Sequence, residues 1–376
     1  MRLIRHVKIF RENAWRDSDI LLEGERIAAI DDRIEAWAPG LVESEGCGMK
    51  AIPGYLDRHV HITGGGGEGG FSNEVPPVRT GELIRGGVTT VTGVLGTDGL
   101  TRSVESLAAK AMALEEEGLT AYFLTGSYSY PSPSVTGSVK KDIVMLKNCL
   151  GVKLAISDHR SSCILDHELA RLAADVWQAG ILKGHPAFVH LHVGHGKEGI
   201  SQLIRLAEKT NLPVRVFQPT HMGNHMESAG HFAKMGGWVD FTVLEDEERN
   251  ADQMVYALEH CPWEKVTFST DGNGSMPVWN ENKEMKGIGI CKVSGIHATV
   301  QTLVKRKGLS LEQAILPCTL NVAKALGLPD KGCLKQGALG DILLLDDQLE
   351  IQSVYALGKE LFHEGRLTFT PKFSDI

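Results

Sequence analysis

Two histidines one residue apart, His59 and His61, stand at the end of an apolar run. Side chains two residues apart in a β-strand point to the same face, so both imidazoles would lie side by side. Such a pair can hold one divalent metal ion, because neutral imidazole is a common zinc ligand. The glycine-rich residues 63–68 that follow would let the backbone approach a ligand closely. The alternative is two histidines in an edge strand beside a flexible loop.

Further residues of suitable chemistry lie in or directly after later apolar runs and favour the metal site. In chain order they are Lys153, His190, His192, His221 and Asp271. The seven cysteines are scattered singly and form no CxxC motif, which argues against a disulfide framework and against a thiolate zinc site. Histidine and carboxylate must therefore hold any metal.

Eight short apolar runs alternate with amphipathic stretches along the middle of the chain. The runs span residues 51–56, 89–95, 121–125, 152–157, 187–193, 213–218, 238–244 and 265–269. The helix-like stretches include residues 102–117, 167–179, 197–209, 253–260 and 311–328. This alternation predicts an α/β fold with a parallel sheet, and eight strands favour closure into a (β/α)8 TIM barrel. Function in such a barrel collects at the carboxyl ends of the strands, where the candidate residues fall.

The two ends of the chain have a different pattern. Short strand-like segments with turn signals span residues 20–22, 27–30, 342–345, 351–356 and 361–363. We therefore expect three parts, with residues 51–330 as the barrel. Residues 1–50 and 331–376 would together form a small β-sandwich domain.

Composition excludes several classes of function. The chain has 376 residues, a formal net charge of −8 and no basic run, which argues against nucleic acid as a partner. No stretch approaches 18 uncharged apolar residues, and the first residues lack an apolar leader, so we expect no membrane association. A cytoplasmic homo-oligomer is the expectation.

The combination of motifs resembles the amidohydrolase superfamily and, within it, the isoaspartyl dipeptidase family. The segments that carry the resemblance are residues 59–61, 64–68, 93–98, 124–128, 152–160, 219–221, 269–275 and 337–341. The resemblance extends over nearly the whole chain. The resemblance implies a metal-dependent hydrolase that cleaves the amide bond of β-aspartyl dipeptides with water activated by two zinc ions.

The resemblance also implies a set of metal ligands. One zinc would be held by His59, His61 and Asp271, and the other by His192 and His221. Lys153 would be carboxylated and bridge both ions.

Lys153 and the histidine ligand from residues 187–193 can each be argued from chemistry or pattern. A carbamate on Lys153 supplies two anionic oxygens, whereas an ammonium group beside two cations is strongly disfavoured. His190 is an alternative ligand to His192. We prefer His192 because Val193 and Gly194 follow it, as in the family pattern.

Roles in substrate binding and catalysis follow from the same resemblance. Glu68 would bind the α-amino group of the substrate, Arg160 a carboxylate, and Ser275 a neighbouring part of the substrate. Tyr128 would donate its hydroxyl to the oxyanion, and Asp271 would take a proton from water and return it to the leaving amine. The alternatives are that Glu68 and Arg160 are solvated loop charges and that Tyr128 is a packing aromatic. Ser275 and Asp271 would then be turn residues.

One position departs from the family pattern. An arginine is expected three residues after the histidine of the sixth strand, but Asn224 stands there, followed by His225. An uncharged amide cannot replace a guanidinium, so Arg160 and His225 would have to bind the carboxylate. The departure leaves open an N-acyl-D-amino-acid deacylase or a cyclic-amide hydrolase. A non-catalytic barrel scaffold is disfavoured because all six metal ligands are present.

Overall fold

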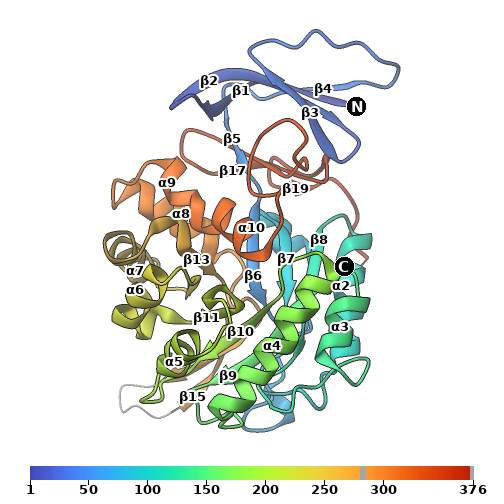
Figure 1. Cartoon of the computed structure of the whole chain (residues 1–376). Coiled ribbons are helices and arrows are strands. Elements are labelled where there is room, and N and C mark those ends of the chain that lie inside the picture. Colours follow the sequence, from blue (N-terminus) through green and yellow to red (C-terminus); the bar gives the residue numbers. More distant parts are fainter. Residues whose placement is uncertain (280–284, 373–376) are drawn as a thin grey trace.

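The computed structural model of the chain describes residues 1–279 and 285–372. Figure 1 shows a larger part, in which helices surround a group of strands, and a smaller β-rich part at one end of it. Strands from both the beginning and the end of the chain lie in the smaller part. The predicted mixed α/β fold with a separate β-rich part is thus confirmed.

The larger part is built around eight strands, each parallel to its hydrogen-bonded neighbours. They are β6 (Tyr55–Val60), β7 (Val88–Gly93), β8 (Thr120–Gly126), β9 (Cys149–Ile156), β10 (Phe188–Val193), β11 (Phe217–Thr220), β12 (Val239–Thr242) and β13 (Val266–Ser269). Strands β6 to β11 form one sheet in sequence order, and β12 pairs with β13. A parallel bridge between Val60 and Gly272 joins the first strand to the segment after the last. The sheet therefore curls back toward its beginning.

Helices cover the outer side of these strands (Figure 1). They are α1 (Thr80–Arg85), α2 (Val104–Glu116), α3 (Val139–Met145), α4 (Asp166–Lys183), α5 (Ser201–Lys209), α6 (Met226–Lys234), α7 (Glu247–His260), α8 (Gly295–Lys305), α9 (Leu311–Ile315) and α10 (Leu320–Leu326). Every residue of β6, β9 and β10 is buried, as expected for parallel strands that helices cover. The helix predicted at residues 311–328 is interrupted instead, because a 3-10 turn that contains Pro317 separates α9 from α10.

The smaller part is one hydrogen-bonded sheet of nine strands. They are β1 (Arg2–Arg11), β2 (Ala14–Glu23), β3 (Arg26–Asp31), β4 (Val42–Glu45), β5 (Lys50–Pro53), β16 (Ile342–Leu345), β17 (Ile351–Ala356), β18 (Lys359–His363) and β19 (Arg366–Leu367). Strand β5 pairs antiparallel with β16, which joins the two ends of the chain. Ile4, Ile20 and Ile342 belong to a buried apolar cluster of this sheet's own.

The apolar run 51–56 was predicted as a single barrel strand, and the structure divides it. Its first half belongs to β5 and its second half to β6, with Gly54 between them. A Cβ at Gly54 would lie 2.4 Å from the Thr89 hydroxyl oxygen, and the Gly54 N–H donates to the Asp341 carbonyl. The backbone turns here from one sheet into the other, which an apolar pattern alone does not reveal.

Two other expectations from composition can be compared with the structure. All seven cysteines are free. In residues 1–279 and 285–372, every helix is too short or too polar to cross a lipid bilayer.

After β13 the chain forms an antiparallel pair, β14 (Ser275–Trp279) and β15 (Met285–Ile290), beside the end of the parallel strands.

Strands β9 and β10 approach closely at Gly151. Phe188 in β10 is the register partner of Gly151, and a Cβ on Gly151 would lie 2.1 Å from the Phe188 carbonyl oxygen. We expect Gly151→Ala to lower the free energy of unfolding by about 1–3 kcal/mol, because backbone must shift to admit the methyl group. Denaturant titration would measure the loss. Gly287→Ala is the control, since a Cβ there meets nothing within 4 Å; equal stability of both variants would contradict the close approach.

Candidate active site

Polar residues from separate strands meet at one end of the parallel sheet. His59, His221 and Asp271 each offer a ligand atom, and these atoms all lie within 4.8 Å of one another. His59 lies in β6, His221 follows β11, and Asp271 follows β13. Both His221 and Asp271 have positive φ angles, 64° and 54°. Such backbone is strained for residues with a Cβ and is often kept at functional sites.

Asp271 connects the first and last strands. Its Oδ1 lies 3.2 Å from His59 Nε2 and 3.1 Å from His61 Nε2. Burial alone would raise the pKa of Asp271, but the hydrogen bonds from both histidines lower the pKa well below its ordinary value. The side chain is therefore a carboxylate at neutral pH. The predicted HxH pair and aspartate are brought together.

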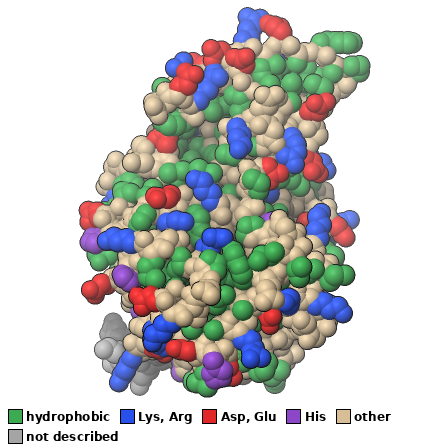
Figure 2. Space-filling view, viewed as in Figure 1, with side chains coloured by type: hydrophobic (Ala, Val, Ile, Leu, Met, Phe, Trp, Pro, Cys, Tyr) green, Lys and Arg blue, Asp and Glu red, His purple; other side chains and the backbone are tan. Residues whose placement is uncertain are grey.

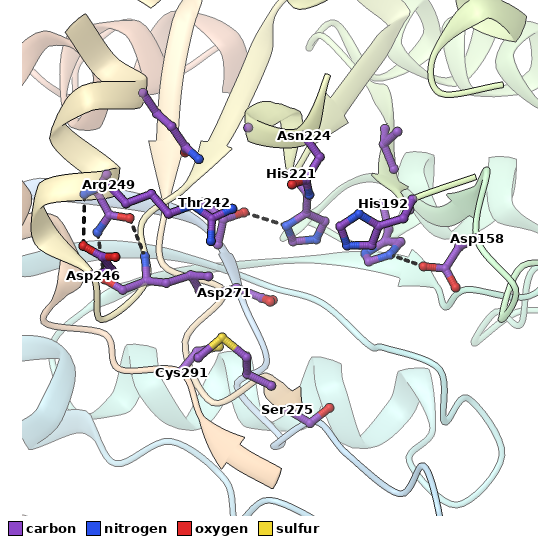
Figure 3. A pocket seen from close by; sticks show the side chains of 18 of the residues that line it. Asp158, His192, His221, Asn224, Thr242, Asp246, Arg249, Asp271, Ser275 and Cys291 are labelled. Atoms are coloured by element: carbon purple, nitrogen blue, oxygen red, sulfur yellow. Dashed lines mark hydrogen bonds and ion pairs between the residues drawn. The ribbon is translucent and has the colours of Figure 1, made fainter. Parts of the chain in front are cut away.

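His221 is oriented through one ring nitrogen and leaves the other without a partner. Its Nδ1 lies 2.5 Å from the Thr242 hydroxyl oxygen (Figure 3), while the buried Nε2 has no hydrogen bond within the described residues. Burial lowers the pKa of His221 well below 6.5 and that of His59 to about 3, with Lys153 contributing to the second shift. A neutral imidazole with one nitrogen held and the other free, as in His221, fits a metal ion.

Lys153 in β9 is fully buried beside this group. Its Nζ lies 3.5 Å from His59 Nε2. Burial lowers the pKa of Lys153 to about 7. No carboxylate of residues 1–279 and 285–372 forms an ion pair with it, and a buried charge without a partner is costly. About half of the Lys153 amine is therefore neutral near pH 7, and the neutral form is the one that can add carbon dioxide.

The two histidines of β10 have different surroundings. His190 Nε2 lies 3.0 Å from His59 Nδ1, so His190 orients the first histidine. The Nδ1 of His192 lies 2.7 Å from the Tyr128 hydroxyl, and its Nε2 lies 2.8 Å from Asp158 Oδ2. Both nitrogens of His192 are thus occupied by protein groups. The structure brings its ring near His221, with centroids 4.6 Å apart, but not into the three-residue group.

Glu68 and Arg160 form an ion pair at the mouth of the site. Arg160 Nη1 lies 3.0 Å from Glu68 Oε1, and its Nε and Nη2 donate to Asp158. The hydroxyls of Thr97 and Ser275 donate to Glu68 at 2.8 and 3.0 Å. Burial would raise the pKa of Glu68, but these hydrogen bonds lower it below its ordinary value. An anion and a cation are therefore held side by side, and Ser275 contacts the anion, Glu68.

Two adjoining cavities open beside these groups. One of about 400 Å³ is lined by His221, Asn224, Asp271 and Ser275 among others (Figure 3). A larger one of about 940 Å³ shares much of this lining and adds Tyr128. Burial raises the pKa of Tyr128 well above 10, so its hydroxyl keeps its proton and can donate. The cavities have room for a small molecule of dipeptide size.

Some residues of the site escaped the sequence analysis. Asp158, which holds Arg160 and His192, lies only two residues before Arg160, and that spacing was an available signal. Thr97 falls in a segment that carried the resemblance, yet no role was assigned to it. Arg249 in α7 lines both cavities and belongs to no recognised motif.

Comparison with known proteins can now be set beside this geometry. The model of the amidohydrolase family matches residues 51–365. The chain belongs to the amidohydrolase family. A solved β-aspartyl dipeptidase from the thermophilic keratin degrader Fervidobacterium islandicum AW-1, in complex with the β-Asp-Leu dipeptide, is 37% identical, with a TM-score of 0.92 over 99% of this chain and 100% of that chain. The family resemblance inferred from the sequence motifs is confirmed.

A more distant solved structure is similar in fold, and several curated proteins are similar in sequence. A D-hydantoinase structure has a TM-score of 0.71 at 16% identity, over 97% of this chain and 96% of that chain. Among curated relatives, a Staphylococcus epidermidis dihydroorotase is 31% identical over 116 residues, which are 31% of this chain and 27% of that protein. Adenine deaminase 2 of Shouchella clausii is 22% identical over 96% of this chain and 59% of its own length. The chain thus spans less than two thirds of these curated relatives.

The surroundings of Lys153 lead to a test. We expect Lys153→Ala to lower hydrolase turnover by more than about 100-fold and to lower the content of bound metal. If the lysine acts as a carbamate, a small carboxylic acid added to the variant should restore part of the activity by supplying the missing carboxylate. Elemental analysis and steady-state kinetics would measure both. Near-normal turnover and metal content in the variant would remove Lys153 from the site; Lys141→Ala, an exposed lysine, is the control.

Proposed function

We propose that this protein is a metal-dependent dipeptidase that cleaves the amide bond of β-aspartyl dipeptides. The observation that carries the proposal is the ion pair between Glu68 and Arg160 beside the His59–His221–Asp271 group. The whole-length similarity to a β-aspartyl dipeptidase supports it.

The ion pair suits one feature of a β-linked substrate. A β-aspartyl residue at the amino end carries a free α-ammonium and a free α-carboxylate on the same carbon atom. Glu68 can accept the ammonium, and Arg160, 3.0 Å away, can donate to the carboxylate. An ordinary α-linked dipeptide has no free carboxylate on that carbon, and an N-acyl amino acid has no ammonium. The pair thus favours β-aspartyl dipeptides over both.

The donor set fits two divalent ions, which we propose to be zinc. The residues that would hold them are His59, His61, carboxylated Lys153, His192, His221 and Asp271. The chemistry that such ions supply when bound is polarisation of the amide carbonyl and a lowered pKa for water. The free Nε2 of buried His221 supports this assignment. His192 would have to exchange its hydrogen bond to Asp158 for this role.

The protein's own groups would carry the proton and stabilise charge. Asp271 is ionised and takes the proton that water loses on attack, then delivers it to the leaving amine nitrogen. Tyr128 keeps its proton and donates its hydroxyl to the oxygen that becomes negative. Ser275, bonded to Glu68 at 3.0 Å, helps to fix the ammonium site.

Finer features of the architecture belong to the same proposal. We propose that the eight strands close into a (β/α)8 barrel and that the terminal sheet folds into a sandwich. The Val60–Gly272 bridge and the 2.8 Å hydrogen bond from His61 N–H to the Gly272 carbonyl support closure. A cytoplasmic homo-oligomer without nucleic-acid or membrane partners remains a prediction. Figure 2 shows basic and acidic side chains interspersed on the face in view.

A substrate panel tests the proposed function. β-Asp-Leu should be hydrolysed with kcat/KM at least about 100-fold above α-Asp-Leu, N-acetyl-D-leucine and dihydropyrimidine substrates, because only the first carries an ammonium and a carboxylate on the same carbon atom, as the Glu68–Arg160 pair requires. With the metal-loaded protein, release of leucine would be measured for the three leucine compounds and ring opening for the dihydropyrimidines. Asn224 favours the alternative, a cyclic-amide or N-acyl hydrolase. Preference for one of those substrates would replace the dipeptidase assignment and leave the family unchanged.

The proton shuttle has a separate test. Asp271→Asn keeps the shape of the side chain and removes its basicity, so turnover should fall roughly 10²–10⁴-fold. Metal content should be measured in the same preparation to separate loss of a ligand from loss of the base. Turnover within a few-fold of the wild type would exclude Asp271 as the base.

A further inference from the structure

The absent arginine at position 224 raises the question of which cation receives the C-terminal carboxylate of the substrate. Among the described residues that line the two cavities, the permanent cations are Arg160 and Arg249. Arg160 is already engaged by Asp158 and Glu68 through three of its nitrogens. His225 is also engaged, since its Nε2 lies 2.8 Å from the Gly194 carbonyl oxygen.

Arg249 differs from these groups in having a free side chain. Within residues 1–279 and 285–372, no hydrogen bond or ion pair holds its guanidinium; only its backbone N–H donates, to Asp246 at 3.0 Å. The neighbouring acid Glu245 pairs with Lys292, and Asp246 caps α7. Arg249 is exposed, so the guanidinium is accessible from the cavity that it lines.

Helix α7 places Arg249 on the side that faces Asn224. Gln253, one helical turn further on, packs so closely on Gly223 that a Cβ there would lie 2.7 Å from its side-chain amide. Residues four apart share a helix face, so Arg249 points to the same side as Gln253. Asn224 follows Gly223 in a 3-10 turn, and Figure 3 shows Arg249, Thr242, His221 and Asn224 around one pocket.

We propose that Arg249 binds the C-terminal carboxylate of the dipeptide, in place of a cation at position 224. The inference rests on the proposed function and names the group that selects a free C-terminus. The family pattern has the cation in the loop after β11, whereas Arg249 lies in the first turn of α7, where the helix dipole also favours an anion. Its planar fork can bind a carboxylate through two hydrogen bonds.

The test compares β-Asp-Leu with its C-terminal amide in wild type and Arg249→Gln. A charge-assisted pair is worth roughly 10- to 150-fold in binding, and exposure to water places this one near the lower end. We therefore expect KM for the free acid to rise on the order of 10-fold in the variant, with kcat nearly unchanged and KM for the amide little affected. Arg306→Gln, an exposed arginine outside both cavities, is the matched control.

A second variant tests whether a cation at position 224 can replace the one at position 249. Adding Asn224→Arg to Arg249→Gln should restore most of the lost affinity for the free acid, because it returns a cation to the same pocket. An acid-to-amide KM ratio that is the same in wild type and Arg249→Gln would overturn the role of Arg249 while the dipeptidase function stands. Wild type inert on both compounds would overturn the proposed function, and the inference with it.

Discussion

The carboxylate of Asp271 holds the first and last strands of the parallel sheet together. One of its oxygens lies within 3.2 Å of His59 and 3.1 Å of His61, directly beside the backbone bridge between Val60 and Gly272. These contacts join segments more than 200 residues apart in sequence. The geometry of the remaining site residues depends on this junction, because His221 and Lys153 are positioned by strands that lie between the two it joins.

Burial sets the protonation of the same group of residues. His59, His190, His221 and Lys153 are removed from water, and burial lowers the pKa of each. Two of their nitrogens, His190 Nδ1 and His221 Nε2, have no hydrogen-bond partner among the described residues, which costs free energy in a folded protein. A chain selected only for stability would fill such a pocket with apolar side chains. The arrangement is instead one of neutral donors around a carboxylate, which is suited to cations.

The sequence predicted the strands and the ligand-bearing ends well where the apolar runs are long and bounded by polar residues. The run 187–193 corresponds to β10, and 265–269 to β13, within one residue at each end. The run 213–218 was less well placed, because its first half is a 3-10 turn and β11 begins only at Phe217. Strand ends depend on tertiary hydrogen bonds that a local pattern does not contain.

The residues of the candidate site also divide into those that local sequence predicts and those that depend on the fold. Residues in short motifs, such as His59, His61 and Asp271, could be found because spacing and strand position already suggest a common location. Arg249 could not be assigned, since its importance comes from a cavity that only the fold creates. Asp158 has one partner two residues away, Arg160, but its second partner, His192, is brought near only by the fold. Likewise, only the three-dimensional structure shows that the guanidinium of Arg249 has no partner among the described residues.

The pairing of β5 with β16 has a consequence for how the chain folds as it is made. Strand β5 leads through Gly54 directly into β6, yet its antiparallel partner β16 is synthesised after all eight strands of the larger part. During translation the edge of β5 is therefore unpaired on that side while the larger part of the protein emerges. The nine-stranded sheet can therefore be completed only after all strands of the larger part have been synthesised.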